Sequence, residues 1–233
     1  MTKCPFEPKR GYVDARVDYL RHFHSLGSSS SSNRDDDDSN LPTASRIAST
    51  NPEEPLYFWQ LYSLIGHDLV VDIVTDFYER VFADTENPWF RSVFEQAAPK
   101  GHHINTQVAY WVDAFGGGRC YHGGNYRLNF HHTHNAREIM NAKGATHWMH
   151  HMKETLLHLL QKQKNPYLVQ DPRIFSCIVT FLETKMRTYA VEHGWKFDES
   201  DFTTLKEAAR RVKKPVKETA KELTENLDKK NFS

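Results

Sequence analysis

The chain has 233 residues, and its 30 Lys and Arg balance its 30 Asp and Glu, so net charge gives no support for a nucleic-acid or anionic-membrane partner. Three widely spaced cysteines without a CxxC pair argue against a disulfide framework and favour a reducing compartment. Because no segment approaches the ~20 apolar residues that span a bilayer, and no apolar signal core opens the chain, we expect a cytoplasmic protein.

The N-terminal part, residues 1–52, is predicted to be a disordered extension. It contains the serine run 28–32 and the aspartate run 35–38, which cannot bury enough apolar area to offset the entropy of ordering. We expect at most a short helix around Tyr12 to His24. Residues 53–195 should form one globular domain, and residues 196–233 a charged, helical tail.

Apolar residues recur at helical spacing throughout the globular part. The pattern predicts a first helix from Pro55 that ends at Gly66 and a second from Asp68 to Phe82. A third should span Ile104 to Phe115 and end at the glycines of 116–118. A loop should follow to Asn129, then a short helix in which Phe130 and His134 lie one turn apart.

Two longer helices complete the predicted domain. One runs from His147 to Lys162, and the other begins at Asp171-Pro172, where an N-cap residue precedes a proline at the first helical position. No stretch shows the alternation of a strand. The fold class is therefore predicted to be all-α.

Histidines are concentrated in one region of this domain. Nine of the fourteen fall between residues 102 and 151, among Tyr, Trp and Phe and not among Cys, Asp and Glu. Imidazole beside an apolar wall suits haem iron, whereas a bare zinc site more often includes thiolates or carboxylates. The composition of this region therefore favours a haem pocket.

Several segments carry a family resemblance. They are "LYSLIG", "FYERVFAD", "WFRSVF", the glycine break "FGGG" and "HWMHHM", in that order. Their order and spacing over about residues 56–190 resemble group II truncated haemoglobins, which include the plant-type proteins. The resemblance implies a two-over-two helical globin sandwich that holds haem b and its iron.

The resemblance also implies roles for individual side chains. It places Tyr78, His103, Gln107 and Trp148 on the distal, ligand-binding side of the haem, where their polar hydrogens can be donated to a bound gas. His103 is also a candidate sixth iron ligand. The residues expected to pack against the haem or hold its propionates are Phe94, Trp111, Phe130 and Arg127, with Arg137 and Lys100 as further candidate cations.

The proximal iron ligand is less directly marked. In the family a histidine lies thirteen residues before the tryptophan that aligns with Trp148, and this chain has Asn135 there. One inserted residue would make His134 the ligand, and we take His134 as the first candidate. The family's Arg-His-x-Pro-Phe signature is replaced by His-Thr-His-Asn, so His131 and His132 compete for the same role.

The implied function is tight binding of dioxygen, nitric oxide and carbon monoxide, with slow release that suits sensing, scavenging or chemistry. Nitric oxide dioxygenation or peroxidase-like chemistry with an external reductase is the implied reaction. Two other classes stay open: a histidine-rich metal-binding protein without haem, and a haem-poor, globin-shaped interaction scaffold. His147 and His151 have the i, i+4 spacing of a metal pair, but we interpret them as part of a solvated polar face.

Overall fold

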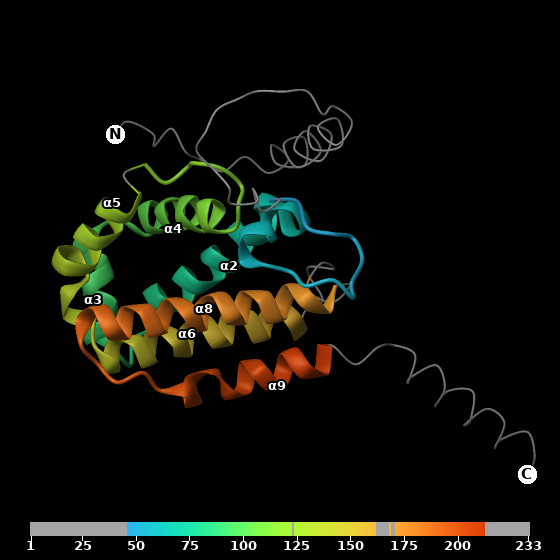
Figure 1. The fold of residues 1–233 in the computed structure, drawn as a ribbon. Coiled ribbons are helices and arrows are strands. Elements are labelled where there is room, and N and C mark those ends of the chain that lie inside the picture. Colours follow the sequence, from blue (N-terminus) through green and yellow to red (C-terminus); the bar gives the residue numbers. More distant parts are fainter. Residues whose placement is uncertain (1–45, 123, 162–167, 169–170, 213–233) are drawn as a thin grey trace, which may run out of the picture.

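The computed structural model describes residues 46–122, 124–161, 168 and 171–212, and in these ranges it contains helices and no strand (Figure 1). The predicted disorder of residues 1–45, the helix around Tyr12 to His24 and the tail beyond residue 212 lie outside the described residues. The elements are η1 (Phe58–Gln60), α2 (Tyr62–Ala83), α3 (Pro88–Ala97), α4 (Lys100–Ala114), α5 (Gly124–Phe130), η2 (His131–Asn135), η3 (Arg137–Ile139), α6 (Ala142–Gln161), α8 (Pro172–His193), η4 (Glu199–Phe202) and α9 (Thr203–Val212).

The core is shared by the four longest helices. Helix α2 packs against both α4 and α6, and its stripe Val70, Val74, Phe77 and Val81 is fully buried. Helix α8 reaches the same core through Phe181, whose ring lies against the rings of α4 and the residue after it. This arrangement is the all-α fold that the sequence predicts.

Gly66 ends the first helical segment, as the sequence predicts: its φ of +65° and ψ of −168° are not helical, so α2 consists of two segments joined at a kink. The first segment begins at Tyr62, later than the predicted start at Pro55. Helix α8 begins as the sequence predicts: Asp171 accepts a hydrogen bond from the backbone N–H of Arg173, and Pro172 occupies the first turn.

The glycine break after α4 is a close packing site. The backbone N–H of Tyr62 donates to the Phe115 carbonyl at 3.0 Å, which draws the end of α4 onto the start of α2. Gly116 then adopts φ +88°, and a Cβ there would lie 1.9 Å from the Trp59 carbonyl oxygen. Only glycine fits this crossing without displacing backbone.

The expected loop before Asn129 is partly helical, which corrects the prediction. Helix α5 occupies Gly124–Phe130 and runs directly into η2, a π-helical turn. The π turn is marked by the Ala136 N–H, which donates to the His131 carbonyl five residues earlier, at 2.9 Å. Gly124, Asn125 and Asn129, which suggested a loop, are exposed on this helix.

Both flanks of the predicted domain extend further than expected. Arg173 donates to the backbone carbonyls of Ser49, Asn51 and Glu54 at 2.6–2.9 Å, which fixes this part of the N-terminal segment. Beyond residue 195, the side chains of Phe202 and Leu205 are fully buried. The boundaries expected at residues 52 and 195 therefore cut through packed structure.

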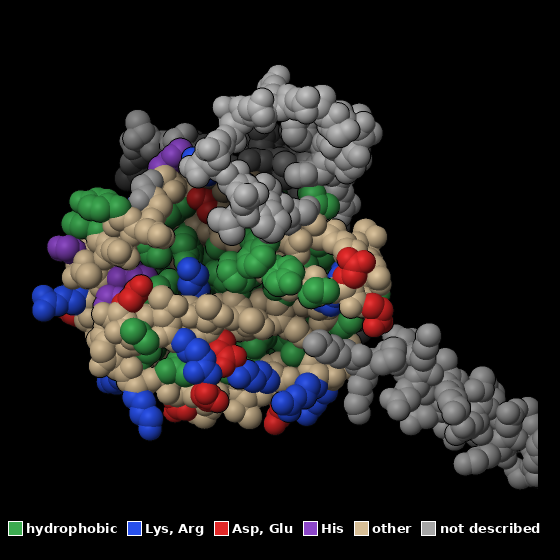
Figure 2. All heavy atoms as spheres, in the orientation of Figure 1, with side chains coloured by type: hydrophobic (Ala, Val, Ile, Leu, Met, Phe, Trp, Pro, Cys, Tyr) green, Lys and Arg blue, Asp and Glu red, His purple; other side chains and the backbone are tan. Residues whose placement is uncertain are grey.

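Helix α9 covers both α6 and α8 and presents its charged side outward. Figure 2 shows Lys, Arg, Asp and Glu side chains intermixed over this face, without a large area of one sign. Among the described residues, no helix combines the length and apolar character needed to cross a bilayer.

Candidate functional site

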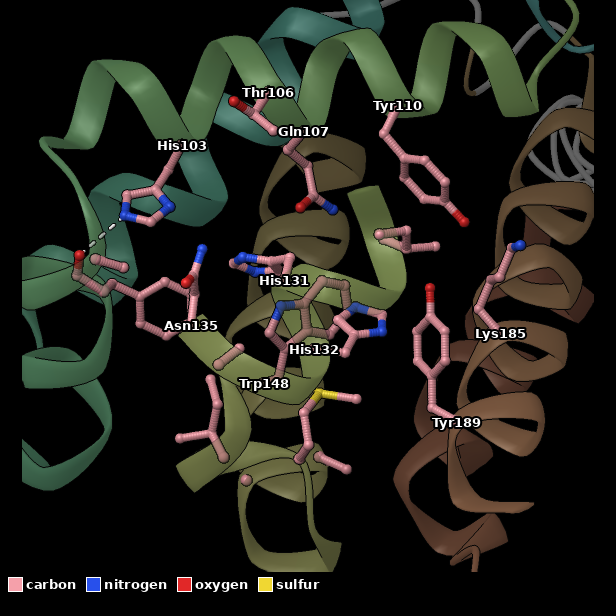
Figure 3. Close-up of a pocket in the computed structure, with 18 of the residues that line it drawn as sticks. His103, Thr106, Gln107, Tyr110, His131, His132, Asn135, Trp148, Lys185 and Tyr189 are labelled. Atoms are coloured by element: carbon pink, nitrogen blue, oxygen red, sulfur yellow. Dashed lines mark hydrogen bonds between the residues drawn. The ribbon is translucent and has the colours of Figure 1, made fainter. Parts of the chain in front are cut away.

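A cavity of about 280 Å³ opens between the helices and is lined mainly by aromatic and aliphatic side chains (Figure 3). The upper wall in that view is α4, and the other walls come from the α5–η2 segment, α6 and α8. Arg127 and seven of the residues predicted to be distal or to pack against the haem line this cavity. The seven are Tyr78, Phe94, His103, Gln107, Trp111, Phe130 and Trp148. Its volume lies near the lower limit of cofactor sites.

Tyr78 and Gln107 form a hydrogen-bonded pair on one side of the cavity. The Tyr78 hydroxyl donates to Gln107 Oε1 at 3.3 Å. Burial raises the pKa of the Tyr78 phenol, so the group stays protonated and remains a donor. With its carbonyl oxygen taken by Tyr78, Gln107 has its amide N–H₂ available to donate into the cavity.

His103 lies beside this pair but is held by another group. Its ring stacks on Tyr78 with centroids 5.3 Å apart. Its Nε2 is 2.9 Å from the Phe94 carbonyl oxygen, so Nε2 carries the hydrogen and donates it (Figure 3). Burial lowers the pKa of His103 and keeps the ring neutral. This bond engages Nε2, and the role of His103 as a sixth iron ligand stays a prediction.

Trp148 completes this side from α6. Its ring packs on Phe77 of α2 with centroids 4.7 Å apart, and the half-buried indole reaches the cavity between α4 and η2 (Figure 3). Thus α2, α4 and α6 all bring polar hydrogen-bonding side chains to the cavity, among them Tyr78, Gln107 and Trp148.

The histidines of η2 face the cavity from the opposite side, and the structure separates the three candidates. His131 and His132 line it, whereas His134 does not. His134 is exposed, its ring stacks on Phe130 at 4.2 Å, and its Nδ1 lies 3.2 Å from the Phe130 carbonyl oxygen. The expectation that His134 meets the iron is not supported by this placement, because the π turn directs Asn135 and the two earlier histidines inward.

His131 and His132 have the chemistry of uncommitted ligands. Burial is the first cause that lowers the pKa of both imidazoles, and nearby positive groups lower it further; His132 reaches about 3. Both rings are therefore neutral at pH 7, as metal binding requires. His132 Nδ1 is buried with no hydrogen-bond partner in the described part of the chain. Such an orphaned nitrogen in an aromatic cavity fits an imidazole-binding cofactor.

The cavity's cations differ in part from those expected. Arg127 lines it, with its guanidinium 4.8 Å from the Tyr121 ring centroid. Lys100 and Arg137 do not line it, and Lys185 of α8 does. Lys185 lies near the tyrosines whose hydroxyls point toward one another in Figure 3, Tyr110 and Tyr189.

Sequence reasoning missed the α8 side of this site. Helix α8 was read only as a core helix, and the residues it brings to the cavity include Phe181, Leu182, Lys185, Met186 and Tyr189. The one available signal was Lys185, a charged residue one turn after the buried Phe181 and one turn before Tyr189.

The comparisons with known proteins agree with this geometry. The sequence model of the bacterial-like globin family matches residues 60–174, a span that runs from η1 through the start of α8 and includes the predicted distal and proximal residues. No solved structure matches the chain at a significant level. Globins are haem proteins that bind diatomic gases, and residues 60–174 place this chain in the bacterial-like globin family.

Proposed function

We propose that this globin holds haem b in the cavity between α4 and η2, with His131 as the proximal iron ligand. When bound, ferrous haem supplies reversible binding of dioxygen, nitric oxide and carbon monoxide. The observation that carries the proposal is the opposition of neutral, inward-facing histidines on η2 to polar donors on α2, α4 and α6 across one apolar cavity.

The choice between the two inward histidines rests on what each faces. In Figure 3 the His131 ring lies below His103 and Gln107 of α4, which supports a position facing the distal helix. His132 instead faces α8, with its ring 4.6 Å from Tyr189 and 5.9 Å from His193. A proximal ligand must lie opposite the distal helix, and this favours His131.

The remaining predicted residues would form the walls of the haem site or pair with the haem propionates. Phe94 and Trp111 are buried walls, and Phe130 and Arg127 line the cavity and are exposed. Arg127 and Lys185 are the cations that would pair with the haem propionates. This assignment replaces Arg137 and Lys100, which lie away from the cavity.

The distal donors predict slow release of gas ligands. Gln107 and Trp148 can donate to an electronegative ligand, and Tyr78 holds Gln107 in the donating orientation. Tight retention suits chemistry on dioxygen better than its transport. We propose nitric oxide dioxygenation, in which nitric oxide, dioxygen and one electron from an external reductase give nitrate.

Haem binding and the ligand assignment are tested by absorption spectra and haem-to-protein stoichiometry of single alanine variants. We expect His131→Ala to lose most of its haem, whereas His134→Ala, on the exposed side of the same turn, should bind haem normally. Loss of haem in His132→Ala with normal binding in His131→Ala would reassign the ligand. A wild-type protein that takes up no haem would refute the proposal and favour a scaffold.

A further inference from the structure

A second group of potential metal ligands lies outside the cavity described above, between α2 and α6. Asp84 follows the last residue of α2, and His147 and His151 are one turn apart on α6. His147 Nε2 lies 2.7 Å and His151 Nε2 3.0 Å from the same oxygen, Asp84 Oδ2. The three ligand atoms all lie within 4.8 Å of one another. We propose that they form a site for a divalent transition-metal ion, and that Zn²⁺ is its natural occupant.

The burial of this cluster contradicts the sequence reading of these histidines as a solvated face. The exposed fractions are 7% for the Asp84 side chain, 8% for His151 and 16% for His147. Aromatic rings exclude water from one side: Phe90 lies 4.7 Å from His147 and 5.8 Å from His151, centroid to centroid. A carboxylate and two imidazoles brought together at this depth need a compensating charge or hydrogen bonds.

The two oxygens of Asp84 are used differently, and this orients the carboxylate. Oδ1 accepts the backbone N–H groups of Glu86 and Asn87 at 3.1 and 2.9 Å and the Asn87 side-chain amide at 3.3 Å. Oδ2 is left to the two imidazoles. Hydrogen bonds of this kind to the outer atom of a ligand residue fix its direction in metal sites.

The donor set and its dimensions fit zinc. Two imidazole nitrogens and one carboxylate oxygen are ligands that Zn²⁺ takes at about 2.0–2.2 Å, which corresponds to ~3.3 Å between neighbouring ligand atoms in a tetrahedron. The observed N–O separations of 2.7 and 3.0 Å are slightly shorter, so a small outward shift of the rings admits the ion. Each neutral imidazole would then carry its single proton on Nδ1 and coordinate through Nε2.

The fourth position would be open to water. His147 also borders a second surface cavity that is lined in part by Asn87, Trp89 and His150. Three protein ligands beside such a cavity leave room for an exchangeable ligand. His150 is exposed and does not belong to the cluster.

An ion at this site would connect α2 and α6, two walls of the cavity that holds Tyr78 and Trp148, without entering that cavity. Asp84 lies one residue beyond α2, which carries Tyr78, and His147 immediately precedes Trp148. The ion would thus fix the end of α2 to α6. The inference does not depend on haem binding.

The test is a zinc titration of tag-free, chelator-washed protein, followed by calorimetry and by the melting temperature. We expect one Zn²⁺ per chain, and a rise in melting temperature of roughly 5 °C or more when free zinc exceeds Kd by about 100-fold. Asp84→Asn and His151→Gln should each weaken binding by at least about tenfold. His150→Ala, on the same helix, should bind zinc as the wild type does.

Each variant is compared with its own zinc-free melting temperature, so a lower starting stability does not obscure the result. Titration of the haem-loaded protein, where the pocket histidines are covered, should give the same stoichiometry. Unchanged zinc affinity in the Asp84→Asn, His151→Gln double variant would place the ion on other histidines. Absence of binding in the wild type would show that the cluster is a hydrogen-bonded clasp only.

Discussion

The hydrogen bond from Tyr78 to Gln107 makes a specific prediction about ligand release. If the Tyr78 phenol touches the gas ligand, the effects of removing the phenol and of removing the Gln107 amide should add. If the phenol only orients Gln107, the two effects should not add. We expect Tyr78→Phe to raise the dioxygen dissociation rate, because the Gln107 amide is then free to rotate away from the ligand.

The size of the effect follows from one neutral hydrogen bond at 3.3 Å. Such a bond contributes a net ~0.5–1.5 kcal/mol, which corresponds to an increase of about 2- to 13-fold in the rate. Gln107→Leu should cause a similar or larger increase. In the Gln107→Leu background, Tyr78→Phe should add little, because the residue that it orients is gone.

The assay is stopped-flow replacement of dioxygen by carbon monoxide on the ferrous protein. Tyr121→Phe removes another phenol from the cavity wall and is the matched control, with an expected rate close to wild type. Fully additive effects of Tyr78→Phe and Gln107→Leu would mean that Tyr78 donates to the ligand itself. Unchanged rates in both variants would refute the proposed distal network and leave Trp148 as the donor.

Three further predictions concern stability, each measured by urea unfolding. Arg173→Met should lower the free energy of unfolding by roughly 2–4 kcal/mol, because charge-assisted bonds to three N-terminal carbonyls are lost; an unchanged value would mean that the segment is held by other contacts. Burial would raise the pKa of Asp171, but hydrogen bonds and the charge of Arg173 outweigh it and depress that pKa. The contribution of Asp171 to the stability of the fold is therefore complete above its unfolded pKa of ~3.9 and is lost as pH falls through the lower folded value. Asp171→Asn should flatten the dependence of the unfolding free energy on acid pH, and an identical pH profile would contradict the assignment. Gly116→Ala should destabilise by ~2 kcal/mol or more because of its positive φ and the clash with Trp59, whereas Gly101→Ala, with nothing within 4 Å of an added Cβ, should be neutral or stabilising; equal effects would show that the crossing at residue 116 can relax.

Most of the helical domain was predictable because its signals are local. The buried stripe of α2 and the capped start of α8 depend on spacing and on residue types that act within one or two turns. The family resemblance predicted Tyr78, Gln107 and Trp148 as distal residues, and each lies on the wall of the cavity.

What failed depended on winding and on long-range packing. The inward histidine could not be found by counting back from Trp148, because a π turn shifts the direction of every side chain before it. The Asp84 cluster joins residues 63 and 67 positions apart in the chain. The helical spacing of His147 and His151 was visible, but nothing local indicated the carboxylate that faces them or the rings that bury them.

The π turn of His131–Asn135 affects how this site tolerates insertions and deletions in evolution. Loss of one residue in the turn would return it to α-helical winding and rotate the side chains that precede it by about 100° relative to the rest of the domain. Three histidines occupy positions 131, 132 and 134, so rotation in either direction brings another imidazole toward the cavity. The histidine-rich turn would therefore keep an imidazole directed toward the cavity after insertion or deletion of one residue, whereas a segment with a single histidine would lose it.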